Sequence, residues 1–123
     1  MSIFYIAFGG AIGSLIRYLI GVFLQNTKSG FPLSTLLVNV VGSFAIGIIF
    51  YILKDSSNEN FKAFIIIGFL GGFTTFSAFS IDVLNLFIEK QYFTSILYIS
   101  MTFLFSLSAV FLGFLFVRLI SDS

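Results

Sequence analysis

The residues of this chain that could do chemistry concentrate in GGFTTFSAFS, the segment Gly71–Ser80, which lies inside a long apolar run. Phe76 and Phe79 are three positions apart and share a helical face, and Ser77 adds a donor between them. Because the edge of a phenyl ring carries partial positive charge, it offers an anion a weak contact that does not titrate. The pattern favours a small, strongly hydrated anion, which would exchange its water for neutral donors and still be free to leave. Packing or contact with lipid is the alternative for the two rings.

The same segment contains residues that weaken a helix near its middle. Gly71 and Gly72 loosen the backbone, and Thr74 and Thr75 are β-branched residues that propagate helix poorly. A break would free carbonyl oxygens, which a membrane tolerates only when another group satisfies them. That group can be a bound cation, and at a two-fold axis two such breaks could hold one ion of the size of Na⁺. A kink packed against a neighbouring helix is the simpler alternative.

Polar side chains in two other apolar runs offer further donors. Asn39 lies within STLLVNVVGSF, where a buried amide needs partners, so it either joins two helices or donates to a passing ion. Tyr98, Thr102 and Ser106 recur at intervals of four residues, which places three hydroxyls on one helical face. These hydroxyls form a polar track or, as is common in membrane helices, bond back to carbonyls of the preceding turn.

Two charged residues lie in the interior of apolar runs, away from their ends. Arg17 is more than halfway along the first run, and its long stem can extend toward the interface. We expect it to be a structural anchor, with the attraction of anions to a vestibule as the alternative. Asp82 lies about two turns before the end of the third run, and we expect it to cap or pair near the mouth of a pathway.

A membrane protein must position these residues. Of the 123 residues, 59% are hydrophobic and 9% charged, so lipid must cover the apolar surface that a soluble core could not. The absence of Cys and His excludes disulfides, thiol chemistry and a histidine base, and no nucleophile with its base is visible, so we expect no enzyme. The net charge of +1 gives no reason to expect a nucleic-acid partner.

Four apolar runs are each long enough to cross a hydrocarbon core of about 30 Å. They cover residues 3–24, 33–53, 61–88 and 92–119, with approximate bounds, and short polar segments connect them within one domain, residues 1–123. The sequence therefore predicts an all-α membrane protein with four transmembrane helices, the third of them broken in mid-membrane. Small residues spaced by four predict close packing of these helices: Gly9 and Gly13, Ser43 and Gly47, Gly68 and Gly72.

Basic residues are balanced across the membrane. Those on the side of both termini are Lys54, Lys62 and Arg118, and those on the opposite side are Lys28, Lys90 and Arg17. Because neither side has the excess of Lys and Arg that would set one orientation by the positive-inside rule, we expect the chain to insert in both orientations. Two opposed copies would pair as an antiparallel dual-topology homodimer with its axis in the membrane plane. Chance balance in a chain with few charges is the alternative.

Three blocks of sequence resemble those of one family, the bacterial Fluc (CrcB-type) fluoride channels. The blocks are GGAIGSLIRY (Gly9–Tyr18), STLLVNVVGSFAIG (Ser34–Gly47) and GFLGGFTTFSAFS (Gly68–Ser80), in the same order and at matching spacing. The hydroxyls of the fourth apolar run resemble the polar face of the family's fourth helix. The resemblance covers essentially the whole chain.

The resemblance implies a passive, fluoride-selective channel of the cell membrane that lowers cytoplasmic fluoride. It also implies an antiparallel homodimer with two pores and a structural Na⁺ at its centre, held by backbone carbonyls of the broken third helix. Matched by position, these carbonyls belong to Gly71 and Thr74. The pore residues that the resemblance implies are Asn39, Phe76, Phe79, Ser77, Tyr98, Thr102 and Ser106. Arg17 matches the conserved arginine of the first helix.

Some residues depart from the pattern of the family. Asp82 stands where Glu is common, Thr102 where Ser is usual, and Ala78 replaces a hydroxyl residue between the two phenylalanines. The Ala78 change removes one donor from the implied pore. Because some organisms carry two paired members, a heterodimer with a paralogue is an alternative to the homodimer.

Two other functions remain as alternatives. A dual-topology antiporter of the small-multidrug type has similar length, but it needs a carboxylate in the first span, where this chain has Arg17 and no Asp or Glu. A non-transporting assembly subunit of a membrane complex is the second alternative. It predicts no ion flux from the purified chain, whereas a channel predicts flux.

Overall fold

The computed structural model describes residues 2–24 and 30–122, in which four helical segments are long and apolar enough to cross a membrane. The segments are Ser2–Leu24, Leu33–Leu53, Glu59–Ile88 and Tyr92–Asp122. The expectation of an all-α protein with four spans is therefore confirmed. Lys28, which entered the count of basic residues, lies outside the described residues.

The first, second and fourth spans are continuous helices: α1 (Ser2–Leu24), α2 (Leu33–Leu53) and α6 (Tyr92–Asp122). Pro32 immediately precedes α2, where its missing N–H costs nothing and its fixed φ suits the start of a helix. Each of these helices exposes aliphatic and aromatic side chains of its own around much of its circumference. Such a helix is stabilised by contact with lipid rather than by one apolar face.

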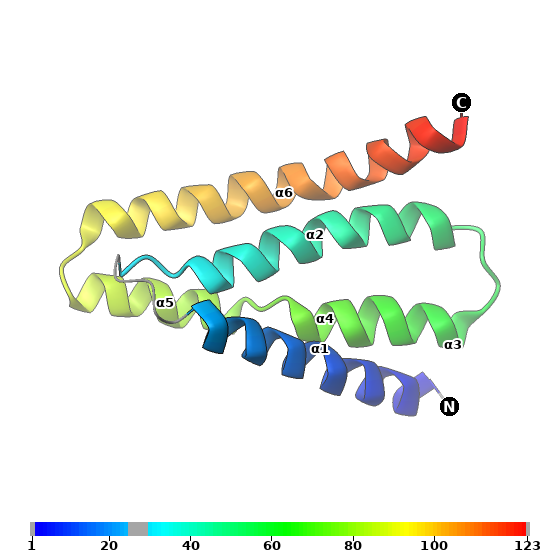
Figure 1. The fold of residues 1–123 in the computed structure, drawn as a ribbon, viewed down its shortest axis with the longest axis horizontal. Coiled ribbons are helices and arrows are strands. Elements are labelled where there is room, and N and C mark those ends of the chain that lie inside the picture. Colours follow the sequence, from blue (N-terminus) through cyan, green and yellow to red (C-terminus); the bar gives the residue numbers. More distant parts are fainter. Residues whose placement is uncertain (1, 25–29, 123) are drawn as a thin grey trace.

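The third span consists of four consecutive pieces: α3 (Glu59–Lys62), η1 (Ala63–Leu70), α4 (Gly71–Phe73) and α5 (Ser77–Ile88). The piece η1 is a π-helix, which is wider than an α-helix because each N–H bonds the carbonyl five residues earlier. Helices of this type are rare and are often found near functional sites. The helix stops at Phe73 and resumes at Ser77, and Thr74 has the extended backbone angles φ −82° and ψ 158°. Figure 1 shows this non-helical stretch as a thin path between α4 and α5.

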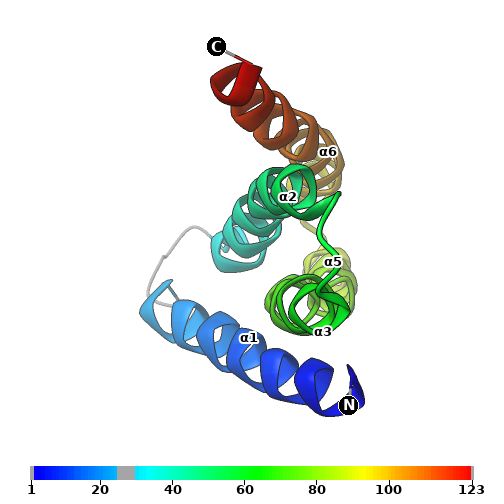
Figure 2. The same ribbon diagram turned by 90° about the vertical axis from the view of Figure 1, so that its right-hand side faces the viewer.

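The four spans pack mainly as two pairs. Figures 1 and 2 show α2 lying along α6, and α1 lying across the third span. Glycine allows the α2–α6 backbones to touch, because a Cβ on Gly47 would collide with the Val110 carbonyl and one on Gly113 with the Phe44 carbonyl. A backbone-to-backbone contact of this kind is typical of helix pairs in membranes.

Glycine also mediates the contact between α1 and the third span. A Cβ on Gly72 would lie 2.6 Å from the Gly10 carbonyl oxygen, and one on Gly68 would lie 2.7 Å from the Ile6 carbonyl oxygen. On the other side of the same contact, a Cβ on Gly13 would collide with the backbone of η1. The first half of the third span, up to the break, is therefore held tightly against α1.

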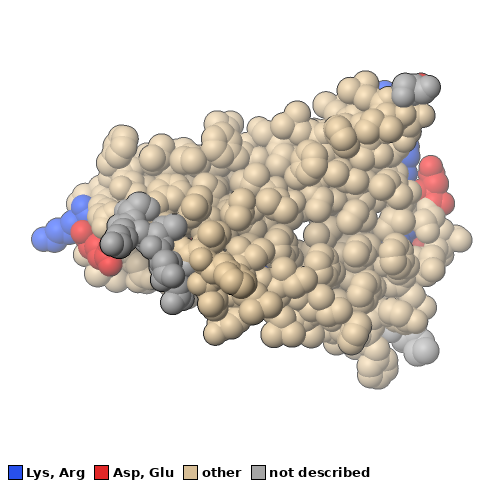
Figure 3. All heavy atoms as spheres, viewed as in Figure 1, with Lys and Arg blue, Asp and Glu red and all other residues tan. Residues whose placement is uncertain are grey.

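On the face shown in Figure 3, the visible charged side chains lie at the two ends of the molecule. Figure 1 places both termini at the same end as the connection between α2 and α3, and the connection between α5 and α6 at the other. Figure 3 shows Lys, Arg, Asp and Glu gathered at these ends, with an uncharged zone between them on the visible face. This distribution suits a protein whose middle lies in hydrocarbon.

A small core joins the second half of the third span to α2 and α6. Its buried members are Leu36, Phe79, Leu86 and Tyr98, which come from α2, α5 and α6. Many other large apolar side chains are exposed on the single chain, where lipid or a second copy can cover them. The core lies next to the break and holds α5 in place there.

Candidate functional site

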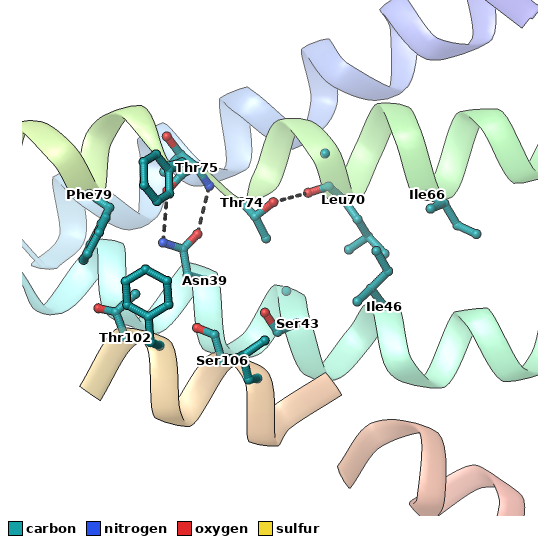
Figure 4. A pocket seen from close by; sticks show the side chains of 15 residues that line it. Asn39, Ser43, Ile46, Ile66, Leu70, Thr74, Thr75, Phe79, Thr102 and Ser106 are labelled. Atoms are coloured by element: carbon teal, nitrogen blue, oxygen red, sulfur yellow. Dashed lines mark hydrogen bonds between the residues drawn. The ribbon is translucent and has the colours of Figure 1, made fainter. Parts of the chain in front are cut away.

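A cavity of about 350 Å³ lies where the break of the third span faces the α2–α6 pair. Figure 4 shows Asn39 and Ser43 from α2, and Thr102 and Ser106 from α6, around it. The described residues that line this cavity are all uncharged. Seven of the residues that the sequence pointed to are among them: Asn39, Gly71, Thr74, Phe76, Phe79, Thr102 and Ser106.

Two of the lining hydroxyls have no protein partner. The Thr102 Oγ1 and Ser106 Oγ atoms are buried, and neither makes a hydrogen bond within the described part of the chain. The structure therefore lacks the bonds to the preceding turn that were the alternative for these two residues. Because a buried hydroxyl without a partner is costly, both are available to donate to an occupant of the cavity.

Asn39 is buried and fastens α2 to the break. Its Nδ2 donates to the Thr75 carbonyl at 3.0 Å, and its Oδ1 accepts from the Thr75 N–H at 2.8 Å (Figure 4). These two partners fix the orientation of the amide, since one is an acceptor and the other a donor. The amide thus joins two helices, and the second N–H on Nδ2 is not part of this pair.

Two N–H groups of the break are bonded to side chains. The Thr75 N–H is bonded to Asn39, and the Ala78 N–H donates to Thr75 Oγ1 at 3.1 Å. In an uninterrupted α-helix, each N–H bonds the carbonyl four residues earlier, so these two would have bonded the carbonyls of Gly71 and Thr74. The break therefore withdraws the regular helical donor from each of these carbonyls.

Arg17 anchors α1 to the edge of the break. Its Nε donates to the Gly72 carbonyl at 3.1 Å. Arg17 also lines a second cavity of about 240 Å³, together with Ser34 and Thr35 of α2. The structure thus places the guanidinium beside the backbone of the third span rather than in the cavity of Figure 4.

The two phenylalanines have different surroundings. Their ring centroids are 5.4 Å apart, but Phe79 is 5% exposed whereas Phe76 is 69% exposed. Phe79 is also packed against Tyr98, at 5.2 Å between centroids, and meets Phe103 at 5.9 Å with the rings nearly perpendicular. The protein therefore holds Phe79 from several sides, while much of the Phe76 ring is open on the single chain.

The remaining predicted residues lie next to the cavity rather than on its lining. Tyr98 is fully buried behind Phe79 and donates a hydrogen bond to Asp82, which gives the carboxylate of Asp82 a partner. Ser77 is exposed, and its Oγ lies 3.2 Å from Thr75 Oγ1. The structure thus groups Ser77 with the hydroxyl of the break rather than with Thr102 and Ser106.

Sequence reasoning did not assign two of the residues at this site. Ser43 lines the cavity, and Thr75 both lines it and provides the hydrogen bonds of the break. Ser43 follows Asn39 by four positions, so their shared helical face was a usable signal. For Thr75 the sequence carried no such signal, because the side chain that bonds its N–H belongs to Asn39, 36 positions away.

Comparison with known proteins identifies the family. Residues 4–114 match the family described as CrcB-like protein, Camphor Resistance (CrcB). This chain belongs to the CrcB-like protein family. With its four candidate spans, the CrcB-like chain is a multi-pass membrane protein.

Curated relatives of this CrcB-like protein carry the name fluoride-specific ion channel FluC. The protein of Rhizobium johnstonii is 43% identical over 116 residues, which are 92% of this chain and 93% of that protein. That of Agrobacterium fabrum is 42% identical over the same length, with the same coverage. FluC 1 of Staphylococcus aureus is 39% identical over 115 residues, 92% of this chain and 93% of its own. The resemblance stated from the sequence is confirmed, and the family is one of ion channels rather than enzymes.

Proposed function

We propose that this CrcB-like protein is a passive, fluoride-selective ion channel of the cell membrane that lowers cytoplasmic fluoride. The observation that carries the proposal is the pair of buried, unpartnered hydroxyls of Thr102 and Ser106 on an uncharged cavity beside Phe76 and Phe79. The names of the relatives support fluoride as the ion.

The chemistry of the cavity suits a small anion that must give up its water. Thr102 and Ser106 can each donate an O–H, and fluoride accepts such bonds more strongly than chloride does. The edges of Phe76 and Phe79 add electropositive contacts without a formal charge. Because the lining residues that the structure describes are uncharged, an ion is held weakly enough to pass on. A carboxylate for proton exchange is not among these lining residues, which favours passive flow over antiport.

We infer an antiparallel, dual-topology homodimer with two pores as the working assembly. The exposure of Phe76 on the single chain supports this assembly, since a second copy can complete the surroundings of the ring. Gly71 is also exposed, so the break lies on a surface that another copy can reach. The balance of basic residues supports opposed orientations.

We also propose a structural Na⁺ at the two-fold axis, held by the carbonyls of Gly71 and Thr74 from each copy. The donor set fits such an ion, because backbone carbonyls are hard oxygen ligands and both have lost their regular helical donors. When bound, the cation would satisfy these oxygens and hold the two breaks together. Fluoride passage itself is assigned to the side chains of the cavity.

The test of the channel is fluoride efflux from liposomes that contain only the purified chain. We expect fluoride to leave down its gradient, with chloride efflux from matched liposomes near the protein-free background. The absence of fluoride efflux would contradict the proposal, as would chloride efflux at an equal rate. If flux appears only after a second, related chain is added, the heterodimer replaces the homodimer.

The test of dual topology uses the absence of cysteine from the chain. Asp55→Cys lies on the α2–α3 connection and Glu89→Cys on the α5–α6 connection, and both native residues are exposed. In intact cells, a membrane-impermeant maleimide should label roughly half of each variant if insertion is balanced. Full labelling of one variant and none of the other would show a single orientation.

A further inference from the structure

The break of the third span is selective in the carbonyls that it leaves available. Four carbonyls around it are occupied by recorded donors, at Leu70, Gly72, Thr75 and Phe76. Leu70 accepts from both the N–H and the hydroxyl of Thr74, at 3.0 and 2.9 Å. Gly72 accepts from Arg17, as described above. These bonds occupy the carbonyls on both sides of Gly71 and the one that follows Thr74, whereas the carbonyls of Gly71, Phe73 and Thr74 have no recorded donor among the described residues.

The carbonyls of Gly71 and Thr74 have each lost their regular donor to a side chain. Asn39 Oδ1 holds the Thr75 N–H at 2.8 Å, which keeps it from the Gly71 carbonyl. Thr75 Oγ1 holds the Ala78 N–H at 3.1 Å, which keeps it from the Thr74 carbonyl. The second bond has the geometry of a helix N-cap, in which a hydroxyl accepts from the N–H three residues later. The neutral side chains of Asn39 and Thr75 thus each remove the regular donor of one carbonyl, that of Gly71 and that of Thr74.

We propose that Asn39 and Thr75 are positioning residues for the cation site, each of which keeps one carbonyl available by holding the N–H that would otherwise occupy it. This inference rests on the proposed structural Na⁺ and deepens it. It gives Asn39 a role that is separate from any contact with fluoride. It also makes the hydroxyl of Thr75, rather than that of Thr74, the one that controls the site.

The physical reason is competition for the same oxygen. An N–H at membrane depth must find an acceptor, and for Thr75 or Ala78 the acceptor that a helix supplies is the carbonyl four residues earlier. Without the side-chain acceptor, the helix can continue across residues 74–76, and the cation must then displace a hydrogen bond. One backbone hydrogen bond is worth about 1 kcal/mol, which weakens cation binding about five- to tenfold.

The Thr75 arm of the test compares Thr75→Val with Thr75→Ser in the purified, detergent-solubilised protein. The readout is the Na⁺ concentration that gives half of the thermal stabilisation, titrated at constant ionic strength with N-methylglucamine as the replacement cation. We expect Thr75→Val, which keeps the shape but lacks the hydroxyl, to raise this concentration about five- to tenfold. Thr75→Ser keeps the acceptor and should remain close to the native value.

The Asn39 arm separates the role at the cation site from a role in the pore. Asn39→Asp keeps an oxygen acceptor for the Thr75 N–H, whereas Asn39→Leu has none. We expect Asn39→Asp to retain the native dependence on Na⁺ while its fluoride efflux falls, because an acidic group beside the cavity disfavours an anion. Asn39→Leu should raise the half-stabilising Na⁺ concentration by about the same factor as Thr75→Val.

The outcomes distinguish this inference from the functions on which it rests. The inference is overturned if both Thr75→Val and Asn39→Leu keep the native half-stabilising Na⁺ concentration. It is also overturned if Asn39→Asp raises this concentration as much as Asn39→Leu does. If the native protein shows no stabilisation specific to Na⁺, the cation site and the inference fail together, whereas fluoride efflux of the native protein decides the channel separately. Because the two arms are independent, a variant that fails to fold leaves the other arm to decide.

Discussion

The phenol of Tyr98 donates a hydrogen bond of 3.0 Å to the carboxylate of Asp82, and Tyr98 is fully buried. This bond links α6 to α5 within the apolar zone. The Tyr98 ring packs against Phe79 at the same time, with 5.2 Å between ring centroids. The pair therefore gives a carboxylate in an apolar run its partner and holds one ring of the candidate pore in position.

The first prediction concerns the stability that this pair provides. Tyr98→Phe leaves the Asp82 carboxylate without this donor, so we expect the free energy of unfolding to fall by about 1–3 kcal/mol. Thermal unfolding in detergent measures the effect. The double variant Tyr98→Phe with Asp82→Leu removes both polar groups and should recover most of the loss. A single variant as stable as the native protein would show that the bond contributes little.

The second prediction concerns Phe76. Phe76→Ile keeps an apolar side chain but removes the electropositive ring edge, so we expect it to abolish fluoride efflux while the dimer survives on gel filtration. Because Phe76 is largely exposed on the single chain, its loss should cost little stability of the protomer. Phe93→Ile on α6, which is also exposed, is the matched control and should conduct normally. Native efflux from Phe76→Ile would show that the ring edge is dispensable.

The third prediction concerns the two unpartnered hydroxyls. Thr102→Val removes a buried hydroxyl that has no partner in the described residues, so the variant should be at least as stable as the native protein. Its fluoride efflux should fall, because one donor is lost from the cavity. Thr102→Ser keeps the donor, and Ser108→Ala changes an exposed position of the same helix, so both should retain efflux. Native efflux from Thr102→Val would exclude its hydroxyl from the pathway.

The fourth prediction concerns the contact between α2 and α6. Gly47→Ala places a methyl group against the Val110 carbonyl, so we expect it to cost about 1–3 kcal/mol in the free energy of unfolding. Gly21→Ala in α1 is the control, because its Cβ would lie 3.9 Å from the nearest atom, Ser34 Oγ. That change should leave stability unchanged or raise it slightly, since Ala is the better helix former. Equal melting temperatures for the two variants would contradict the prediction.

Hydropathy predicted the number of spans because lipid imposes one simple condition, the length of an apolar helix. The second span has the expected bounds, Leu33–Leu53, and α6 extends to Asp122, three residues beyond the expected 119. The π-helix η1 could not be predicted in the same way. Its sequence, AFIIIGFL, is uniformly apolar, so nothing in it distinguishes one helical pitch from another.

The candidate site was predictable in its residue types but not in its pairings. The sequence indicated that Asn39 needed partners, and it left open which partners these are. The structure supplies both from Thr75, which is 36 positions away and comes close only after two helices pack. Likewise, helical spacing placed Thr102 and Ser106 on one face, but only the packing of α6 against the other helices buries both hydroxyls with no partner among the described residues.

The glycine contact between α2 and α6 has a mechanical consequence. Side chains normally form a deformable layer between helices, and at Gly47 and Gly113 this layer is missing, so the two backbones touch. The two helices can neither shear nor separate without losing that contact, so they behave as one rigid unit on their side of the cavity.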